Sequence, residues 1–202
     1  EIERIEFAQT IRFGGRSDVQ IDANGKTRHV WVDTHDVLAI PYDIPVPGFE
    51  NEIVNTLRLW SAATRDEFDL EEFNAGSYAD SVASKNAAEN ITMVLYPNAE
   101  TENGQELRLR QQYFLASASL QDTIRNWQRR KGDDFVGFEE KNCFQVTDTH
   151  PAVAVAELMR LLLDEHGLEW GEAWDTTRKT MAYTNHTLLP EALEMWPVSM
   201  FR

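Results

Sequence analysis

Apolar and polar positions alternate in the N-terminal part of the chain, and this period of two predicts β-strands. The first strand is expected over residues 5–13 and a short second one over 19–21, before a turn at 22–25 that ends in Asn24-Gly25. A third strand is predicted over 29–40. The apolar side of the first strand is formed by Ile5, Phe7, Ile11 and Phe13.

Three prolines follow the third predicted strand. Pro41, Pro45 and Pro47 have no backbone N–H to donate, so residues 41–48 are not expected to form a central strand of a sheet. A short apolar segment at 56–60 comes next. The N-terminal part is therefore expected to be an antiparallel, β-rich region.

After residue 73 the spacing of apolar positions changes to three or four, which is the period of an α-helix. The polar residues 98–105 predict a loop. One helix or two are predicted over 76–95. Further helices are predicted over 106–130, 151–165, 171–179 and, as a short last one, between Pro190 and Pro197, with strands over 143–147 and 180–184. This order predicts an α/β layer with partly parallel strand pairing. The fold class expected is α/β, with residues 1–62 as the β-rich part and 63–202 as the α/β part of one larger domain.

The charge balance restricts the partners that the chain is expected to have. It carries 19 Lys and Arg against 34 Asp and Glu, a formal net charge of −15. Such a surface repels nucleic acid and anionic lipid, so neither is an expected partner. The single cysteine, Cys143, allows no intrachain disulfide, and no signal peptide or apolar run of membrane-spanning length occurs. The expected compartment is the cytoplasm.

Most motifs of catalytic chemistry do not occur in the sequence. It has no glycine-rich phosphate loop, and its five histidines show no metal-binding spacing. Two polar clusters remain, 148–151 and 183–187, and each follows a predicted strand. Open α/β sheets bind ligands at the carboxyl ends of their strands, while Thr149 or His150 could instead simply cap the following helix. The pattern alone predicts an α/β domain that binds something polar.

Several long strings of residues, in order and at consistent spacing, resemble the α-glucan (glycogen, starch or maltodextrin) phosphorylases. They are Asn55-Thr56-Leu57-Arg58-Leu59-Trp60-Ser61-Ala62, the segments 89–98 and 106–122, Asp148-Thr149-His150-Pro151 with its continuation to Arg160, and Tyr183-Thr184-Asn185-His186-Thr187 with its continuation to Glu194. The resemblance covers residues 32–197, whereas the first thirty residues match loosely. It implies that the chain corresponds to the latter part of the family's N-terminal domain.

The resemblance also implies an activity for the longer parent protein. Members of the family cleave α-1,4 glucosidic bonds at non-reducing ends with phosphate and release glucose 1-phosphate. Their pyridoxal phosphate cofactor is bound to a lysine of the C-terminal domain, and none of this chain's lysines, Lys26, Lys85, Lys131, Lys141 and Lys179, lies in that motif. The segment alone is therefore expected to be inactive. The expected partners are α-1,4-glucan, phosphate, the rest of the phosphorylase chain and a second copy in a homodimer.

Residue by residue, the resemblance places three side chains at the substrate cleft. His186 matches the histidine that bonds the 6-hydroxyl of the glucosyl unit, and Asp148 and His150 match groups that line the cleft. Residues 98–104 match the gate loop, here with Asn98, Glu100 and Thr101. Residues 99–101 replace the family's Asp-Asn-aromatic run, so Glu100 keeps an acceptor but the aromatic stacking partner is missing.

A second departure from the family concerns regulation. The short connection 131–135 replaces the longer insert with an arginine pair that holds AMP in nucleotide-controlled members. Arg129-Arg130 is interpreted instead as a solvated charge pair at a helix end. The parent is therefore expected to be a bacterial-type enzyme without AMP control.

Two other functions are compatible with the sequence. One is a non-enzymatic α/β carbohydrate-binding or interaction domain derived from a phosphorylase. It differs from the enzyme in whether the open reading frame continues into a lysine-bearing cofactor domain. The other is a hydrolase that uses Asp148 and Glu100, which would require the two carboxylates at a defined separation.

Overall fold

The computed structural model describes residues 1–21, 25, 27–64, 82–190 and 193–201. The chain forms two compact units, one of Glu1–Phe13 with His35–Phe114 and one of Gly14–Thr34 with Leu115–Arg202. Helix α3, Glu102–Lys131, contributes residues to both units. The predicted division at residue 62 falls within a strand of the first unit, and it stays a prediction.

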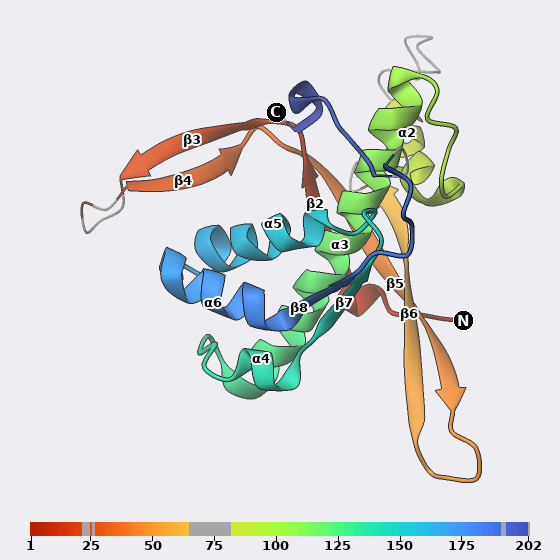
Figure 1. Cartoon of the computed structure of the whole chain (residues 1–202), viewed down its shortest axis with the longest axis vertical. Helices are drawn as coiled ribbons and strands as arrows, with labels where there is room; N and C mark the ends of the chain where they lie inside the picture. The colour runs from red at the N-terminus through yellow and green to blue at the C-terminus, as the bar shows by residue number, and fades with distance from the viewer. Residues whose placement is uncertain (22–24, 26, 65–81, 191–192, 202) are drawn as a thin grey trace. The chain divides into compact units, whose positions relative to one another are not determined.

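The first unit is built on an antiparallel sheet with β5 at its centre. Strand β5 (His35–Pro47) pairs with β1 (Ile2–Glu3) and β2 (Gln9–Phe13) along one edge and with β6 (Val54–Thr64) along the other. In Figure 1, β5 and β6 form a long two-stranded ribbon. Ile11 and Phe13 are buried, as their predicted apolar side requires.

The predicted strand 5–13 is wrong in its first part. Residues Ile5–Phe7 form a 3₁₀ turn, η1, between β1 and β2, closed by the Ala8 N–H donating to the Ile5 carbonyl (3.0 Å). Ile5 is exposed, while the Phe7 ring lies beneath the guanidinium groups of Arg4 (4.9 Å) and Arg58 (5.5 Å). The alternating pattern cannot signal this turn, because one of the two arginine contacts to Phe7 comes from Arg58 in β6, which is distant in sequence.

The prediction that the prolines exclude a central strand is wrong for residues 41–43, which lie between the β1 segment and β6, whereas residues 44–47 pair with β6 alone and form an edge. Pro41, Pro45 and Pro47 lie in β5, opposite Trp60, Thr56 and Val54 of β6. In an antiparallel strand, the nitrogen and the carbonyl of one residue face the same edge, and this edge alternates from residue to residue. The Pro41 carbonyl accepts from the Arg4 N–H on the β1 side (2.9 Å). The nitrogens of all three prolines, which have odd numbers, therefore face the β1 side of β5. There η1 interrupts the partner strand at Pro41, and the β1 pairing ends at Asp43 before Pro45. No ladder hydrogen bond to β6 is lost.

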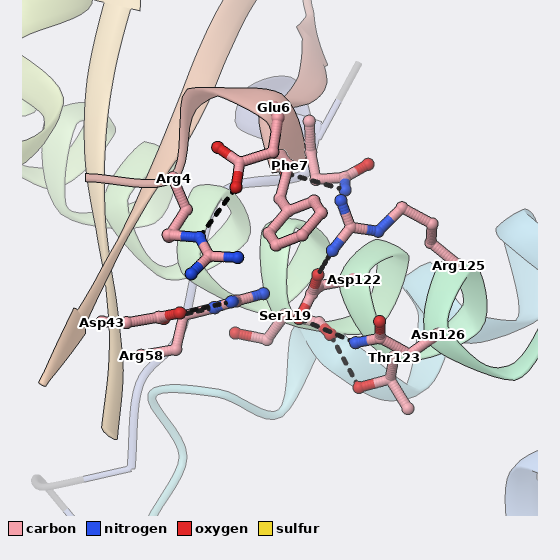
Figure 2. Close-up of polar contacts among 11 residues, drawn as sticks. Arg4, Glu6, Phe7, Asp43, Arg58, Ser119, Asp122, Thr123, Arg125 and Asn126 are labelled. Carbon is pink, nitrogen blue, oxygen red and sulfur yellow. Dashed lines mark hydrogen bonds and ion pairs between the residues drawn. The ribbon is translucent and has the colours of Figure 1, made fainter. Parts of the chain in front are cut away.

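Charged groups stabilise this sheet at its β5–β6 edge. Arg58 donates from Nε and Nη2 to the two oxygens of the Asp43 carboxylate, both at 2.7 Å, next to the Arg4–Glu6 pair (Figure 2). The guanidinium of Arg58 holds the pKa of the Asp43 carboxyl below its ordinary value. The two-pronged geometry fixes the side chain as well as the charge.

Helix α2 (Ala83–Met93) packs on β6, and the Ala62 N–H donates to the Thr92 hydroxyl (2.9 Å). It confirms the later part of the predicted helix 76–95, while residues 65–81 lie outside the described residues.

Helix α3 begins at Glu102, four residues before the predicted start, because Thr101 caps it: the Thr101 hydroxyl accepts from the Gly104 N–H (3.1 Å). The apolar core of this unit is formed by Ile11, Phe13, Val37, Ala39, Ala62, Ala88, Ile91, Leu109 and Phe114.

The second unit begins with an antiparallel hairpin of β3 (Arg16–Ile21) and β4 (Thr27–Val32). The single strand predicted over 29–40 is in fact two, β4 and β5. The chain breaks at Asp33, whose backbone is left-handed (φ 57°) and whose carboxylate accepts from Arg16 Nε (3.0 Å). The predicted turn residues 22–24 lie outside the described residues.

The rest of the second unit packs helices around an apolar core. Besides α3 these are α4 (Phe138–Lys141), α5 (Val153–Arg160), the π-helical turn η3 (Leu161–Glu165) and α6 (Trp170–Thr180). The apolar spacing that predicts the helix over 106–130 is confirmed by the burial of Leu120, Ile124 and Trp127, which follow one another at intervals of three or four. Gly167 (φ 70°) ends the predicted helix 151–165, with Leu168 N–H donating to the Leu162 carbonyl (2.9 Å). On α3, Arg129 and Arg130 are exposed, as a solvated pair requires.

Strands β7 (Phe144–Thr147) and β8 (Met181–Thr184) pair in parallel, and helices α5 and α6 connect them (Figure 1). This confirms the partly parallel α/β layer and the mixed α/β fold class. The helix predicted between Pro190 and Pro197 is wrong for the described residues 193–197, which carry no helix, and a 3₁₀ turn, η5 (Val198–Phe201), follows instead. No helix in the described part of the chain is long and apolar enough to cross a membrane.

Candidate functional site

The parallel pairing of β7 and β8 places the two polar clusters side by side. Thr147 and Thr184 are partners in the register, so both strands end at the same edge. The next residue, Asp148, continues the ladder: its N–H donates to the Thr184 carbonyl (2.8 Å), and its Oδ1 accepts from the His186 N–H (3.0 Å). Asp148 has a left-handed backbone (φ 58°), a conformation that Asp tolerates better than most residues. The structure therefore joins Asp148 to His186 as the two strand ends predict.

The backbone around His186 is held while its ring is exposed. On the preceding side, the Thr184 hydroxyl accepts from Gln145 Nε2 (3.0 Å). On the following side, Asn185 bridges to Thr187, donating from Nδ2 to its carbonyl (2.8 Å) and accepting from its N–H at Oδ1 (3.2 Å). An exposed imidazole on a fixed backbone can donate or accept a hydrogen bond to a ligand hydroxyl.

His150 lies in the turn that leads from β7 into α5, and it does not cap that helix. The N-cap residue is Ala152, without a side-chain cap, and its N–H donates to the Thr149 carbonyl (3.1 Å). The alternative that Thr149 or His150 caps the helix is therefore wrong. His150 Nδ1 lies 3.1 Å from Oε1 of Glu194, in the segment after β8. Glu194 was not predicted as a site residue, since nothing in its spacing from His150 indicates the contact.

The predicted gate residues lie in the first unit and form an ordered turn at the start of α3. Asn98 Oδ1 accepts from the Glu100 N–H (2.9 Å), and Gln105 Nε2 donates to the Ala99 carbonyl (3.2 Å). Together with the Thr101 cap, these bonds fix the backbone of residues 98–105. The carboxylate-bearing residue Glu100 is exposed.

The chain just before the gate is anchored by a buried glutamine that sequence reasoning did not single out. Gln111 of α3 donates from Nε2 to the Val94 carbonyl (2.7 Å) and accepts from the Tyr96 N–H at Oε1 (3.2 Å). Tyr96 has a left-handed backbone (φ 54°), and Arg108 lies over its ring (5.3 Å). A polar residue on the inner side of a predicted helix is the signal that could have found Gln111.

The described lysines do not form a site for a covalently bound pyridoxal phosphate. Lys85 pairs with Glu89 (3.8 Å) and Lys179 with Glu139 (3.4 Å) on the surface, and Lys131 and Lys141 are also exposed. A Schiff-base lysine needs a desolvated pocket that keeps its amine neutral, and none of these four has one. Among the described residues, no group of three or more His, Cys, Asp and Glu is placed to hold a metal ion.

Comparison with known protein families identifies the class to which the chain belongs. The family model described as carbohydrate phosphorylase matches residues 1–202. The chain belongs to this family, which confirms the resemblance.

Glycogen phosphorylases are among the relatives to which the chain is similar. It is 50% identical to the brain form of glycogen phosphorylase from Ovis aries over 208 aligned positions, covering 100% of this chain. It is 49% identical to the muscle form from Bos taurus, covering 99% of this chain, and 49% identical to the brain form from Homo sapiens, covering 100%. In each case the match covers 24% of the relative, so the chain spans about a quarter of their length.

Proposed function

We propose that the protein to which this chain contributes is an α-glucan phosphorylase, which cleaves α-1,4 glucosidic bonds with phosphate and releases glucose 1-phosphate. In this proposal the segment forms one wall of the active-site cleft and carries the gate loop. Family membership and the identity to glycogen phosphorylases support the activity. The observation that carries the role of the segment is the bond from the His186 N–H to Asp148 at the shared strand end.

His186 is the residue that we assign to the sugar. A neutral imidazole has one N–H donor and one acceptor nitrogen, so it can bond a hydroxyl in either direction, and the 6-hydroxyl of the glucosyl unit is the group that the family resemblance implies. Asp148 has a different task from the one that cleft lining suggests. Its Oδ1 binds the backbone of residue 186, so it holds the histidine in place.

Pyridoxal phosphate is proposed for the parent protein, bound outside this segment, because the described lysines do not fit it. We assign no step of the reaction to this chain's lysines. The role of the segment is to bind and orient the glucan, with residues 98–104 controlling access. The other proposed partners are phosphate, the rest of the phosphorylase chain and a second copy in a homodimer, and the proposed compartment is the cytoplasm.

The test uses His186→Ala in the longer protein, with glucosyl donors that carry or lack the 6-hydroxyl. A net hydrogen bond contributes about 0.5–1.5 kcal/mol, and an unpaired buried partner costs roughly 1–3 kcal/mol, so kcat/KM should fall about 2- to 160-fold with the 6-hydroxy donor. With a 6-deoxy donor, the wild type should lose most of its advantage over the variant. His29→Ala, an exposed histidine on β4, serves as the matched control and should leave both rates unchanged.

Two results would contradict the proposal, one for the role of His186 and one for the activity itself. If the wild-type to variant ratio is the same for both donors, His186 does not bond the 6-hydroxyl. If the wild-type protein, loaded with pyridoxal phosphate, forms no glucose 1-phosphate from glucan and phosphate, the activity itself is wrong, and the carbohydrate-binding domain is the better description.

A further inference from the structure

Glu194 and His150 form a pair that joins the two segments at the carboxyl ends of β7 and β8. His150 lies in the turn after β7, and Glu194 lies ten residues after the end of β8. The Oε1–Nδ1 distance is 3.1 Å. The Glu194 side chain is 12% exposed and that of His150 is 32% exposed, so the carboxylate is the more buried of the two groups.

The chemistry of the two groups fixes the direction of this hydrogen bond. An ionised carboxylate has no proton to donate, so Nδ1 of His150 must be the donor. A neutral imidazole carries one proton, and with that proton on Nδ1 the other ring nitrogen, Nε2, is an acceptor. Glu194 therefore selects one of the two neutral forms of the ring and also restricts its rotation.

We propose that Glu194 is a positioning residue: it holds His150 with Nδ1 protonated, so that Nε2 accepts a hydrogen bond from a hydroxyl of the bound glucan. The identity of the ligand rests on the proposed function, whereas the protonation pattern of the ring does not. A purely structural role, in which Glu194 only anchors the segment after β8, would leave the reaction insensitive to which ring nitrogen is protonated.

The first experiment measures the ring directly and needs no glucan. In the 202-residue chain labelled with ¹⁵N at histidine, long-range ¹H–¹⁵N correlations distinguish a protonated from an unprotonated ring nitrogen. In its neutral form, the His150 ring should show a protonated Nδ1 and an unprotonated Nε2. In Glu194→Ala, the Nδ1-protonated form should lose its dominance. A wild-type ring protonated mainly at Nε2 overturns the proposal, whatever the behaviour of the variant.

The second experiment tests whether Glu194 acts through His150. In the longer protein, Glu194→Ala should lower kcat/KM for glucan by roughly tenfold, the loss expected for one charge-assisted hydrogen bond. In a His150→Ala background the same change should have little further effect, because the group that it positions is gone. Full additivity of the two losses would overturn the proposal.

A matched control separates this effect from a change in surface charge. Glu172→Gln, on the exposed side of α6, removes one negative charge from the same unit and should leave kcat/KM unchanged. If the wild-type protein shows no phosphorolysis, the proposed function is wrong. In that case the ¹⁵N measurement still shows whether Glu194 keeps Nδ1 of His150 protonated.

Discussion

Single side chains decide the conformation of the gate residues at the start of α3. Thr101 caps the helix, Asn98 closes the turn onto Glu100, and Gly104 lies against the Asn98 carbonyl. A Cβ atom at position 104 would overlap that carbonyl oxygen and come within 3.2 Å of the Thr101 hydroxyl. Position 104 therefore needs glycine because there is no room for a Cβ atom, and not because of its φ angle, which lies outside the left-handed region.

Gly104→Ala is expected to destabilise the first unit. The methyl group cannot be accommodated without moving the backbone of residue 98, and overpacking of this kind costs about 1–3 kcal/mol. Gly171→Ala is the matched control, because a Cβ there meets no atom within 4 Å and lies in helix α6. It should be neutral or stabilising by up to about 1 kcal/mol. Urea unfolding of both variants measures the difference, and equal midpoints would contradict the close approach.

At the scale of secondary-structure elements, a buried charge pair joins four segments of the second unit. Glu157 of α5 is almost fully buried and accepts from Arg160 Nε (2.7 Å) and from the Ser117 hydroxyl of α3 (2.6 Å). Arg160 also donates to Glu165 of η3 (2.9 Å) and lies over the Trp31 ring of β4 (5.3 Å). The hairpin, the π-helical turn and helices α3 and α5 therefore share one set of polar contacts.

Arg160→Met should lower the free energy of unfolding by about 3–5 kcal/mol, because it leaves the buried Glu157 carboxylate without its counter-charge. The double variant Arg160→Met/Glu157→Gln should recover part of that loss. Arg178→Met is the matched control, since Arg178 also pairs with a carboxylate three residues earlier, Asp175, but both side chains are exposed. It should hardly change stability. If adding Glu157→Gln to Arg160→Met lowered the free energy of unfolding further, Glu157 would not be the group that Arg160→Met leaves unpaired.

At the scale of the whole molecule, the residues that we propose for glucan binding are divided between the two units, and the described lysines do not fit the cofactor that we propose for the parent protein. Asp148, His150 and His186, which we propose to form the sugar-binding side, belong to the second unit, and the proposed gate residues belong to the first. The described lysines are surface residues, two of them in ion pairs. In our proposal, the segment supplies binding groups, and the acid–base chemistry belongs to the rest of the parent protein.

The 202-residue chain alone is therefore expected to form no covalent adduct with pyridoxal phosphate and no glucose 1-phosphate. Incubation with the cofactor, reduction with borohydride and mass spectrometry of the chain check the first expectation. Non-specific labelling of surface lysines is controlled by the variant Lys85→Arg/Lys179→Arg, which should lower any background in proportion to the lysines removed. Stoichiometric labelling at one lysine, with a cofactor absorbance band, would show that the chain holds a site of its own.

The sequence by itself determined the features that depend on neighbours along the chain. The apolar stripe of α3, the end of η3 at Gly167 and the polar clusters after β7 and β8 are all readable because helix and strand periods place side chains locally. The parallel pairing was also predictable, since strands alternating with helices favour it. His186 and Asp148 were found at those strand ends together with the family resemblance, and the pairing explains why they meet.

Only the tertiary structure decided the features that depend on partners distant in sequence. The prolines of β5 are compatible with pairing to β6 because the register places their nitrogens away from β6, and the register is set by pairing between strands. The turn at 5–7 is held by an arginine of β6, and the break at Asp33 separates strands that join different units. The Glu194–His150 pair and the buried Glu157 likewise need contacts 40 or more residues apart, and no local period records them.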